Sequence, residues 1–160
     1  MRLTILYSYS YSYFVILFLM LTPWEEILRL GGALLIGFLI GLEREISKKP
    51  AGLRTHMIIS LASALFTMLS FSSAFGNGAA DPTRIASQIL TGMGFVGAGV
   101  IISSGGQVKG VTTAASLWVT AAMGMAMGLG EYVLALAAIG LTLLTLLVFK
   151  LLENAIGQVE

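Results

Sequence analysis

The residues whose types and spacing could support chemistry lie just after Asp81. Asp81, Arg84 and Gln88 follow at intervals of three and four residues, so they share one face if this segment is helical. Pro82 predicts that the helix begins here with Asp81 as its N-cap, and that Gln88 faces the interior of a bundle. The three groups form our candidate polar functional cluster. They could bind an ion or polar solute, or simply cap the helix and hydrogen-bond to a neighbouring helix.

A second polar set flanks the expected helix starts at residues 55 and 112. Residues 43–54 form the most basic loop, which the positive-inside rule places in the cytoplasm together with the loop that carries Lys109. Glu43 and Arg54 either anchor the loop at the membrane interface or pair across it. We expect the threonines at 112 and 113 to cap a helix. The only histidine, His56, is interpreted as structural or as a proton sensor. The predicted cytoplasmic mouth comprises Glu43, Arg44, Arg54, Thr55, Lys109, Thr112 and Thr113.

Glycines recur inside the apolar runs. Gly92, Gly94, Gly97 and Gly99 include a G-x-G-x-x-G spacing, but no strand precedes it, which argues against a dinucleotide site. Close helix packing is the favoured interpretation, and local unwinding that exposes carbonyl groups to an ion is the alternative. Gly37 and Gly41 form a similar small-xxx-small pair. We therefore predict helix packing or interaction at Gly37, Gly41, Gly92, Gly94, Gly97 and Gly99.

The elements that must position these residues are membrane helices. Of the 160 residues, 57% are hydrophobic and 11% charged, and the mean hydropathy is +0.92, which indicates an integral membrane protein. The net charge of +1 gives no sign of nucleic-acid binding, and the absence of cysteine excludes disulfides and thiolate sites. The fold class is all-α, a polytopic bundle of five core helices with a possible extra one at the N-terminus. We expect the helices at about 27–42, 55–75, 82–102, 112–129 and 132–150.

Three regions divide the chain. Residues 1–22 are an apolar extension, a signal-like segment or an extra helix, with Pro23 starting the next helix. Residues 23–152 form the membrane domain, and 153–160 a short cytoplasmic tail. Similar positions of Arg29 and Arg84, and of Gly37 and Gly92, leave an internal repeat open.

Many separate matches in one order carry a family resemblance. The chain resembles the N-terminal transmembrane domain of the MgtC/SapB family between Ile27 and Phe149, without the soluble C-terminal domain of many members. The matching segments are Gly41-Leu42-Glu43-Arg44-Glu45, 51–56 (AGLRTH), Asp81-Pro82, Arg84-Ile85-Ala86, Gln88-Ile89, Gly92, Gly94-Phe95, 97–101 (GAGVI) and 112–118 (TTAASLW). The resemblance implies a multi-pass protein of the bacterial inner membrane, and the positive-inside rule places its C-terminus in the cytoplasm. It also implies adaptation to low magnesium, survival of pathogens inside host cells, and restraint of ATP synthase.

Two functions remain open on the sequence. The first is non-enzymatic modulation of other membrane machinery through helix–helix interaction, with the lipid bilayer, a second copy (preferably as a dimer), ATP synthase or small membrane peptides as partners. The second is an ion or small-solute transporter linked to Mg²⁺. No sequence-local cluster of carboxylates supports a dedicated Mg²⁺ site, so the metal ligands are unknown and no cofactor is expected. No combination of nucleophile, base and orienting group indicates an enzyme.

Overall fold

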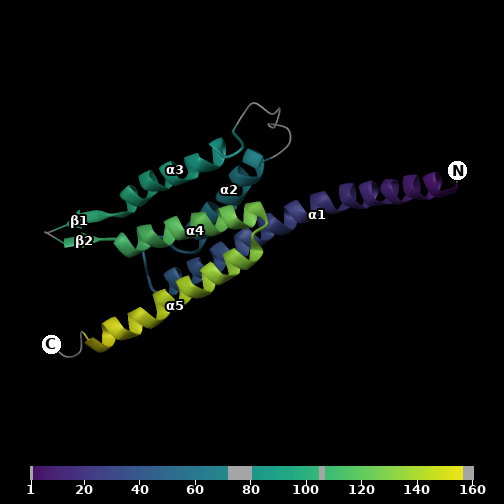
Figure 1. Ribbon diagram of the computed structural model, residues 1–160. Coiled ribbons are helices and arrows are strands. Elements are labelled where there is room, and N and C mark those ends of the chain that lie inside the picture. Colours follow the sequence, from purple (N-terminus) through teal and green to yellow (C-terminus); the bar gives the residue numbers. More distant parts are fainter. Residues whose placement is uncertain (1, 72–80, 105–106, 157–160) are drawn as a thin grey trace.

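A computed structural model describes the backbone of residues 2–71, 81–104 and 107–156, and the side chains of 23–71, 81–101 and 108–149. Within these ranges the chain forms five helices and one two-stranded hairpin (Figure 1). The helices are α1 (Arg2–Ile46), α2 (Leu53–Phe71), α3 (Arg84–Val100), α4 (Val111–Leu129) and α5 (Tyr132–Ile156), and the strands are β1 (Ile102–Ser104) and β2 (Gln107–Lys109). The last residues of the helix expected at 55–75 and the part of the predicted tail beyond residue 156 lie outside the described residues.

Helices α2, α4 and α5 have the length and apolar composition needed to cross a membrane. Their starts lie within two residues of the predicted ones, because long apolar runs bounded by glycine and charge define them. Gly130 ends α4 in a left-handed conformation (φ 81°), and its N–H donates to the last carbonyls of the helix. Helix α5 continues past the expected end at Lys150. The chain is thus an all-α bundle of a membrane protein, as predicted.

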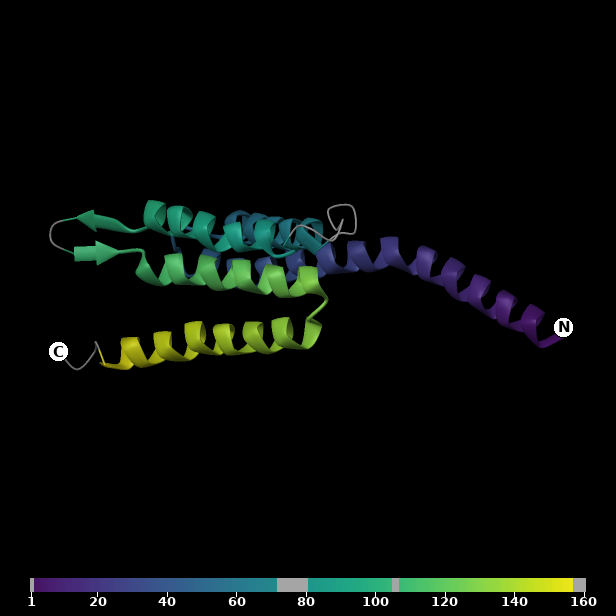
Figure 2. The ribbon, with the colours of Figure 1, turned by 45° about the horizontal axis from the view of Figure 1, so that its top comes forward.

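Helix α1 differs from the prediction of a helix that starts at Pro23. It is one continuous helix of 45 residues with Pro23 inside it. At about 1.5 Å per residue it is about 68 Å long, more than twice the hydrocarbon core of about 30 Å. Its N-terminal turns therefore run beyond the other helices (Figure 2). Proline only disturbs the bonds of one turn, and the apolar residues on both sides of Pro23 favour a helix equally.

The segment after α3 is also different from the prediction. We expected helix to Ile102 and a loop to Lys109, whereas α3 ends at Val100 and β1 pairs antiparallel with β2, Ile102 opposite Lys109. Ile101 already has extended dihedral angles (φ −81°, ψ 116°). Gly110 then takes a left-handed conformation (φ 90°) and serves as N-cap of α4, so the threonines at 112 and 113 lie in its first turn rather than capping it.

Helices α2 and α4 form the centre of the bundle. Helix α2 contacts α1, α3 and α4, and α4 contacts all four of the other helices. One apolar core joins α1, α2, α4 and α5 around Ile40 and Met123, and a second joins α3 and α4 around Met93 and Leu117. Helix α5 lies on the outer side of α4 and buries only Ala135 and Ile139 among its described side chains (Figure 2). Polar residues on α2 and α4 are therefore enclosed on most sides.

Candidate functional site

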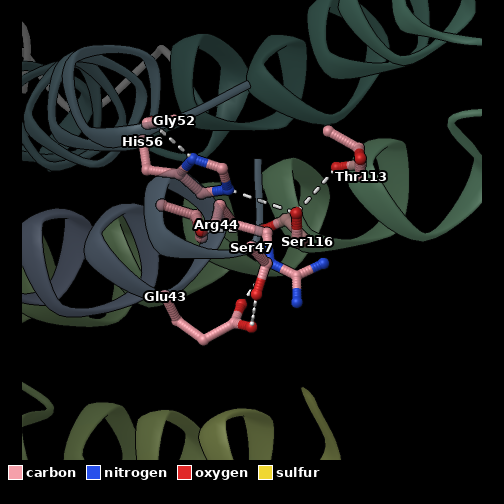
Figure 3. A network of polar contacts seen from close by, with 8 residues as sticks. Glu43, Arg44, Ser47, Gly52, His56, Thr113 and Ser116 are labelled. Atoms are coloured by element: carbon pink, nitrogen blue, oxygen red, sulfur yellow. Dashed lines mark hydrogen bonds and ion pairs between the residues drawn. The ribbon is translucent and has the colours of Figure 1, made fainter. Parts of the chain in front are cut away.

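A buried ion pair lies where α1 ends (Figure 3). The Nε of Arg44 donates to Oε2 of Glu43, and the hydroxyl of Ser47 donates to Glu43 Oε1 at 2.7 Å. Arg44 is only 3% exposed and Glu43 8%. Burying either charge alone would cost several kcal/mol, so the Glu43 carboxylate and the Arg44 guanidinium each require the other. The pair fixes the orientation of the Arg44 side chain.

His56 is fully buried beside this pair and connects α2 to α4 (Figure 3). Its Nδ1 lies 2.9 Å from the carbonyl oxygen of Gly52, so Nδ1 must carry a hydrogen. Its Nε2 lies 3.1 Å from Ser116 Oγ, which is itself 2.8 Å from the Thr113 carbonyl oxygen. A neutral ring would accept from the Ser116 hydroxyl, whereas a protonated ring would donate to it and the hydroxyl would turn to Thr113.

Hydroxyl groups continue from His56 along the contact between α2 and α4. We name this set the hydroxyl seam, and all of its members are buried. Thr67 and Thr120 donate to carbonyl oxygens of their own helices, at 2.8 and 2.7 Å. In the described part of the chain Ser60 Oγ is buried without a hydrogen-bond partner. The seam comprises Ser60, Ser63, Thr67 and Ser70 of α2 and Thr113, Ser116 and Thr120 of α4.

Sequence reasoning did not identify the hydroxyl seam. The signal was present in the spacing of Ser60, Ser63, Thr67 and Ser70, which recur every three or four residues in an apolar helix. At the far end of α2, Ser70 donates to the carbonyl group of Pro82 and accepts from the Ala86 N–H at 3.1 Å. The seam therefore extends through the bundle from His56 to the start of α3.

A cavity of about 730 Å³ opens beside the Glu43–Arg44 pair, and we name it the basic cavity. It lies between the α1–α2 loop, the start of α4 and the second half of α5. Four cationic side chains line it, and no acidic residue is among its described lining residues. Thr145, Leu146 and Phe149 form the α5 wall. The remaining lining residues are Arg44, Lys48, Lys49, Pro50, Val108, Lys109, Gly110, Val111, Thr112 and Thr113.

The structure brings part of the predicted cytoplasmic mouth together here. Arg44, Lys109, Thr112 and Thr113 line the basic cavity, and Glu43 adjoins it through Arg44. Arg54 and Thr55 are exposed and do not line it. Of the two interpretations of Glu43 and Arg54, pairing across the loop is wrong, because Glu43 pairs with Arg44. Arg54 lies two residues before the buried His56, and residues at positions i and i+2 of a helix point in nearly opposite directions. Arg54 therefore faces away from the buried side.

The predicted polar functional cluster, Asp81, Arg84 and Gln88, lies at the start of α3, far from the basic cavity. Asp81 is exposed and accepts from the backbone N–H of Thr83 at 2.9 Å and from its hydroxyl at 2.7 Å. These bonds hold the pKa of Asp81 below its usual range, and Arg84 adds a weaker effect. The N-cap is Thr83 rather than Asp81, so the helix begins two residues later than expected. Gln88 is exposed on this chain instead of facing the interior of the bundle.

The predicted glycines fall into two groups. A Cβ on Gly37 would lie 2.6 Å from the backbone of α2, and one on Gly41 2.7 Å, so the backbones of α1 and α2 nearly touch. Gly97 would meet Ala114 at an ordinary 3.6 Å, whereas Gly92, Gly94 and Gly99 have no atom within 4 Å.

The close contacts on α4 were missed. Gly128 would approach the Ala64 carbonyl oxygen to 2.6 Å, and Gly124 packs directly on the backbone of Ser60. Gly124 and Gly128 have the same spacing as Gly37 and Gly41, which was the available signal.

Helix α3 buries only Ala86, Ile89 and Met93 among its described residues. Six of its exposed residues share one side, which we name the α3 face: Arg84, Gln88, Thr91, Gly92, Phe95 and Gly99. Phe95 is 85% exposed. A groove of about 310 Å³ runs between this face and α2, with Gln88 and Gly92 among its lining residues. The described side chains contain no group of three or more His, Cys, Asp or Glu residues that could hold a metal ion.

Comparison with known proteins gives consistent matches. The model of the MgtC family matches residues 30–155. "Putative magnesium transporter YhiD" of Escherichia coli K12 is 45% identical over 130 residues, which cover 78% of this chain and 60% of that protein. "Protein SapB" of Bacillus subtilis 168 is 41% identical over 130 residues (75% and 56%), and "Protein MgtC" of Salmonella typhimurium LT2 41% over 134 residues (84% and 55%). The chain thus spans 55–60% of these relatives' lengths. No solved structure matches.

Proposed function

The chain belongs to the MgtC family, and we propose from this that it is a non-enzymatic protein of the bacterial inner membrane that modulates other membrane machinery. The name of the YhiD relative connects that protein with magnesium, and we extend this connection to adaptation of the cell to low magnesium. The C-terminus is proposed to be cytoplasmic. The basic residues Lys48, Lys49 and Lys109 lie at the end of the bundle where α5 ends, and basic residues mark the cytoplasmic side. The proposed mode of action is lateral docking of helices.

The observation that carries this proposal is the α3 face. In lipid, a glutamine amide finds no hydrogen-bond partner, and polar side chains of membrane helices almost always face protein or water. Gln88 is nevertheless exposed on this chain, and Gly92 and Gly99 beside it have open space where a Cβ would stand. Small residues next to a polar one are the usual composition of a helix–helix interface in membranes.

The occupant that we propose for the α3 face is a second copy of the chain. A carboxamide both donates and accepts hydrogen bonds, so Gln88 can pair with its own copy across a two-fold axis. Gly92 and Gly99 would let the two backbones approach. Other membrane proteins, such as ATP synthase or small membrane peptides, would then meet the dimer rather than the single chain.

Cysteine cross-linking in native membranes tests the docking. The chain contains no cysteine, so Thr91→Cys on the α3 face introduces one unique thiol. We expect oxidation to give a cross-linked dimer, and Gly92→Leu in the same chain to abolish it. Leu136→Cys on exposed α5 is the matched control and should remain monomeric. Equal cross-linking at both positions would show random collision and refute the proposed interface.

Transport is the second candidate, and one observation favours it. The hydroxyl seam crosses the bundle, adjoins the basic cavity and contains the unpartnered Ser60 hydroxyl. Sealed liposomes with purified protein should be tested for Mg²⁺, K⁺ and H⁺ flux, beside a Ser60→Ala variant and an Arg84→Ala variant. Docking as the sole function predicts no flux. A flux that Ser60→Ala removes while the fold is intact would replace docking by transport along the seam.

A further inference from the structure

We propose that the basic cavity binds an oxyanion of the phosphate type. This inference is independent of docking at the α3 face, because it concerns the opposite end of the bundle and different residues. Its volume of about 730 Å³ is within the range of about 300–1,000 Å³ that is usual for small-molecule sites. Four cationic side chains line it without a described acidic one, so its electrostatic potential favours an anion.

Arg44 is the buried part of the site. Glu43 accepts a hydrogen bond only from its Nε, and no other residue in the described part of the chain hydrogen-bonds to this guanidinium. The side chain is 3% exposed, yet it lines the cavity, so its remaining N–H groups can serve a ligand there. A guanidinium fork matches the geometry of two phosphate oxygens. Glu43 and Ser47 hold the fork in place before any ligand arrives, which lowers the cost of binding.

The start of α4 adds backbone donors to the same cavity. The first intrahelical bond runs from the Ala114 N–H to the Gly110 carbonyl at 2.9 Å, so the N–H groups of Val111, Thr112 and Thr113 precede the hydrogen-bonded ladder. No side chain caps them. Free N–H groups and the helix dipole favour an anion here. Glycine suits position 110 because the chain enters α4 there with a left-handed φ of 90°.

Three lysines complete the set: Lys48 and Lys49 of the α1–α2 loop and Lys109 at the end of β2. All three are exposed, so each can adjust to a ligand without a large cost of reorganisation. Lys48 has φ of 51°, a conformation that asparagine adopts more easily than lysine. Two sources could supply the phosphate group: a free phosphate anion, or the headgroup of an anionic phospholipid whose apolar part would lie on Leu146 and Phe149 of α5.

The competing explanation is general attraction between basic residues and an anionic membrane surface. In that case every exposed cation at this end would contribute equally to anion binding. Arg54 provides the comparison, since it is exposed, cationic and close in sequence but does not line the cavity. Binding at a specific site in the cavity depends on the cavity lysines and not on Arg54. Non-specific attraction to the surface would depend on all of these cations alike.

The test uses the full chain purified in a maltoside detergent, which contains no phosphate. Inorganic phosphate and, separately, short-chain phosphatidylglycerol are titrated, and calorimetry gives the dissociation constant. We expect the combined Lys48→Asn and Lys109→Gln variant to weaken binding at least tenfold, and Arg54→Gln less than twofold. Arg44→Gln is avoided because it would leave Glu43 buried without its cation.

Each result has a defined meaning. Binding of inorganic phosphate with the expected variant pattern identifies a free oxyanion as ligand, and binding of the lipid alone identifies the headgroup. The absence of binding by both probes would overturn the proposal. So would an equal loss in the Arg54→Gln protein and the double variant, since that result indicates diffuse attraction. Thermal unfolding of each variant in the same detergent verifies the fold, and the single Lys48→Asn variant provides an independent repeat.

Discussion

Gly37→Ala should weaken the packing of α1 on α2. The new Cβ would lie 2.6 Å from the His56 carbonyl oxygen and from the Met57 Cα, whereas ordinary contacts begin near 3.4 Å, so the helices must separate by about 0.8 Å. Both contacts are backbone atoms, which cannot rotate away. Overpacking of this kind costs about 1–3 kcal/mol, and the gain of alanine over glycine in a helix offsets about 0.5–1 kcal/mol of it. The net loss in the free energy of unfolding should be about 0–2.5 kcal/mol.

Gly31 provides the matched control in the same helix. No atom lies within 4 Å of the position that its Cβ would take, so Gly31→Ala should be neutral or stabilise by up to about 1 kcal/mol. Equilibrium unfolding in mixed micelles with increasing sodium dodecyl sulfate, followed by circular dichroism, measures both variants of the full chain. If the Gly37 variant is as stable as the Gly31 variant, the backbones of α1 and α2 do not approach as described.

Three further substitutions test other contacts by the same unfolding assay. Arg29→Gln should lower stability by about 1–2 kcal/mol, because Arg29 Nη1 donates to the Gly128 carbonyl oxygen at 2.9 Å; no loss would exclude this cap. His56→Ala should cost about 2–4 kcal/mol by removing a fully buried ring and its hydrogen bonds; an unchanged midpoint would contradict its burial. Asp81→Asn should abolish one acid-sensitive contribution to stability, because the Thr83 contacts lower the native pKa of Asp81. In the unchanged protein this contribution is fully present above about pH 4 and is lost as the pH falls through the lowered native pKa. Identical acid profiles of the two proteins would disprove the Thr83 contacts.

The helices of the centre were predictable because lipid imposes a simple rule on sequence. A span must be long and apolar, and α2, α4 and α5 satisfy this with clear ends, such as Gly130 after α4. The same rule does not separate a lipid-facing side from a buried one, because both are apolar. Continuation of α1 through Pro23 and the β1–β2 hairpin depend on local backbone preferences that are only weakly expressed in the sequence.

The candidate site was predictable only in part for a related reason. Charge placed Arg44 and Lys109 at one end, and the structure joins them around the basic cavity. The number of glycines drew attention to α3, yet Gly124 of α4 makes the tighter contact, since packing depends on which helix lies opposite. Serine and threonine in an apolar helix are weak signals individually, and only their shared face on α2 gives Ser60 and its neighbours meaning.

The link between His56 and Ser116 also has a consequence for biogenesis. The two residues are 60 positions apart, and ribosomes add about 5–20 residues per second, so α2 emerges about 3–12 s before its partner on α4 exists. During that interval the side of α2 that will contact α4, from His56 to Thr67, has only α1, α3 and its own backbone as protein neighbours. We expect nascent α2 to remain at the insertion machinery, shielded from lipid, until α4 arrives. Chains that stop before Val111 should then be released poorly and degraded.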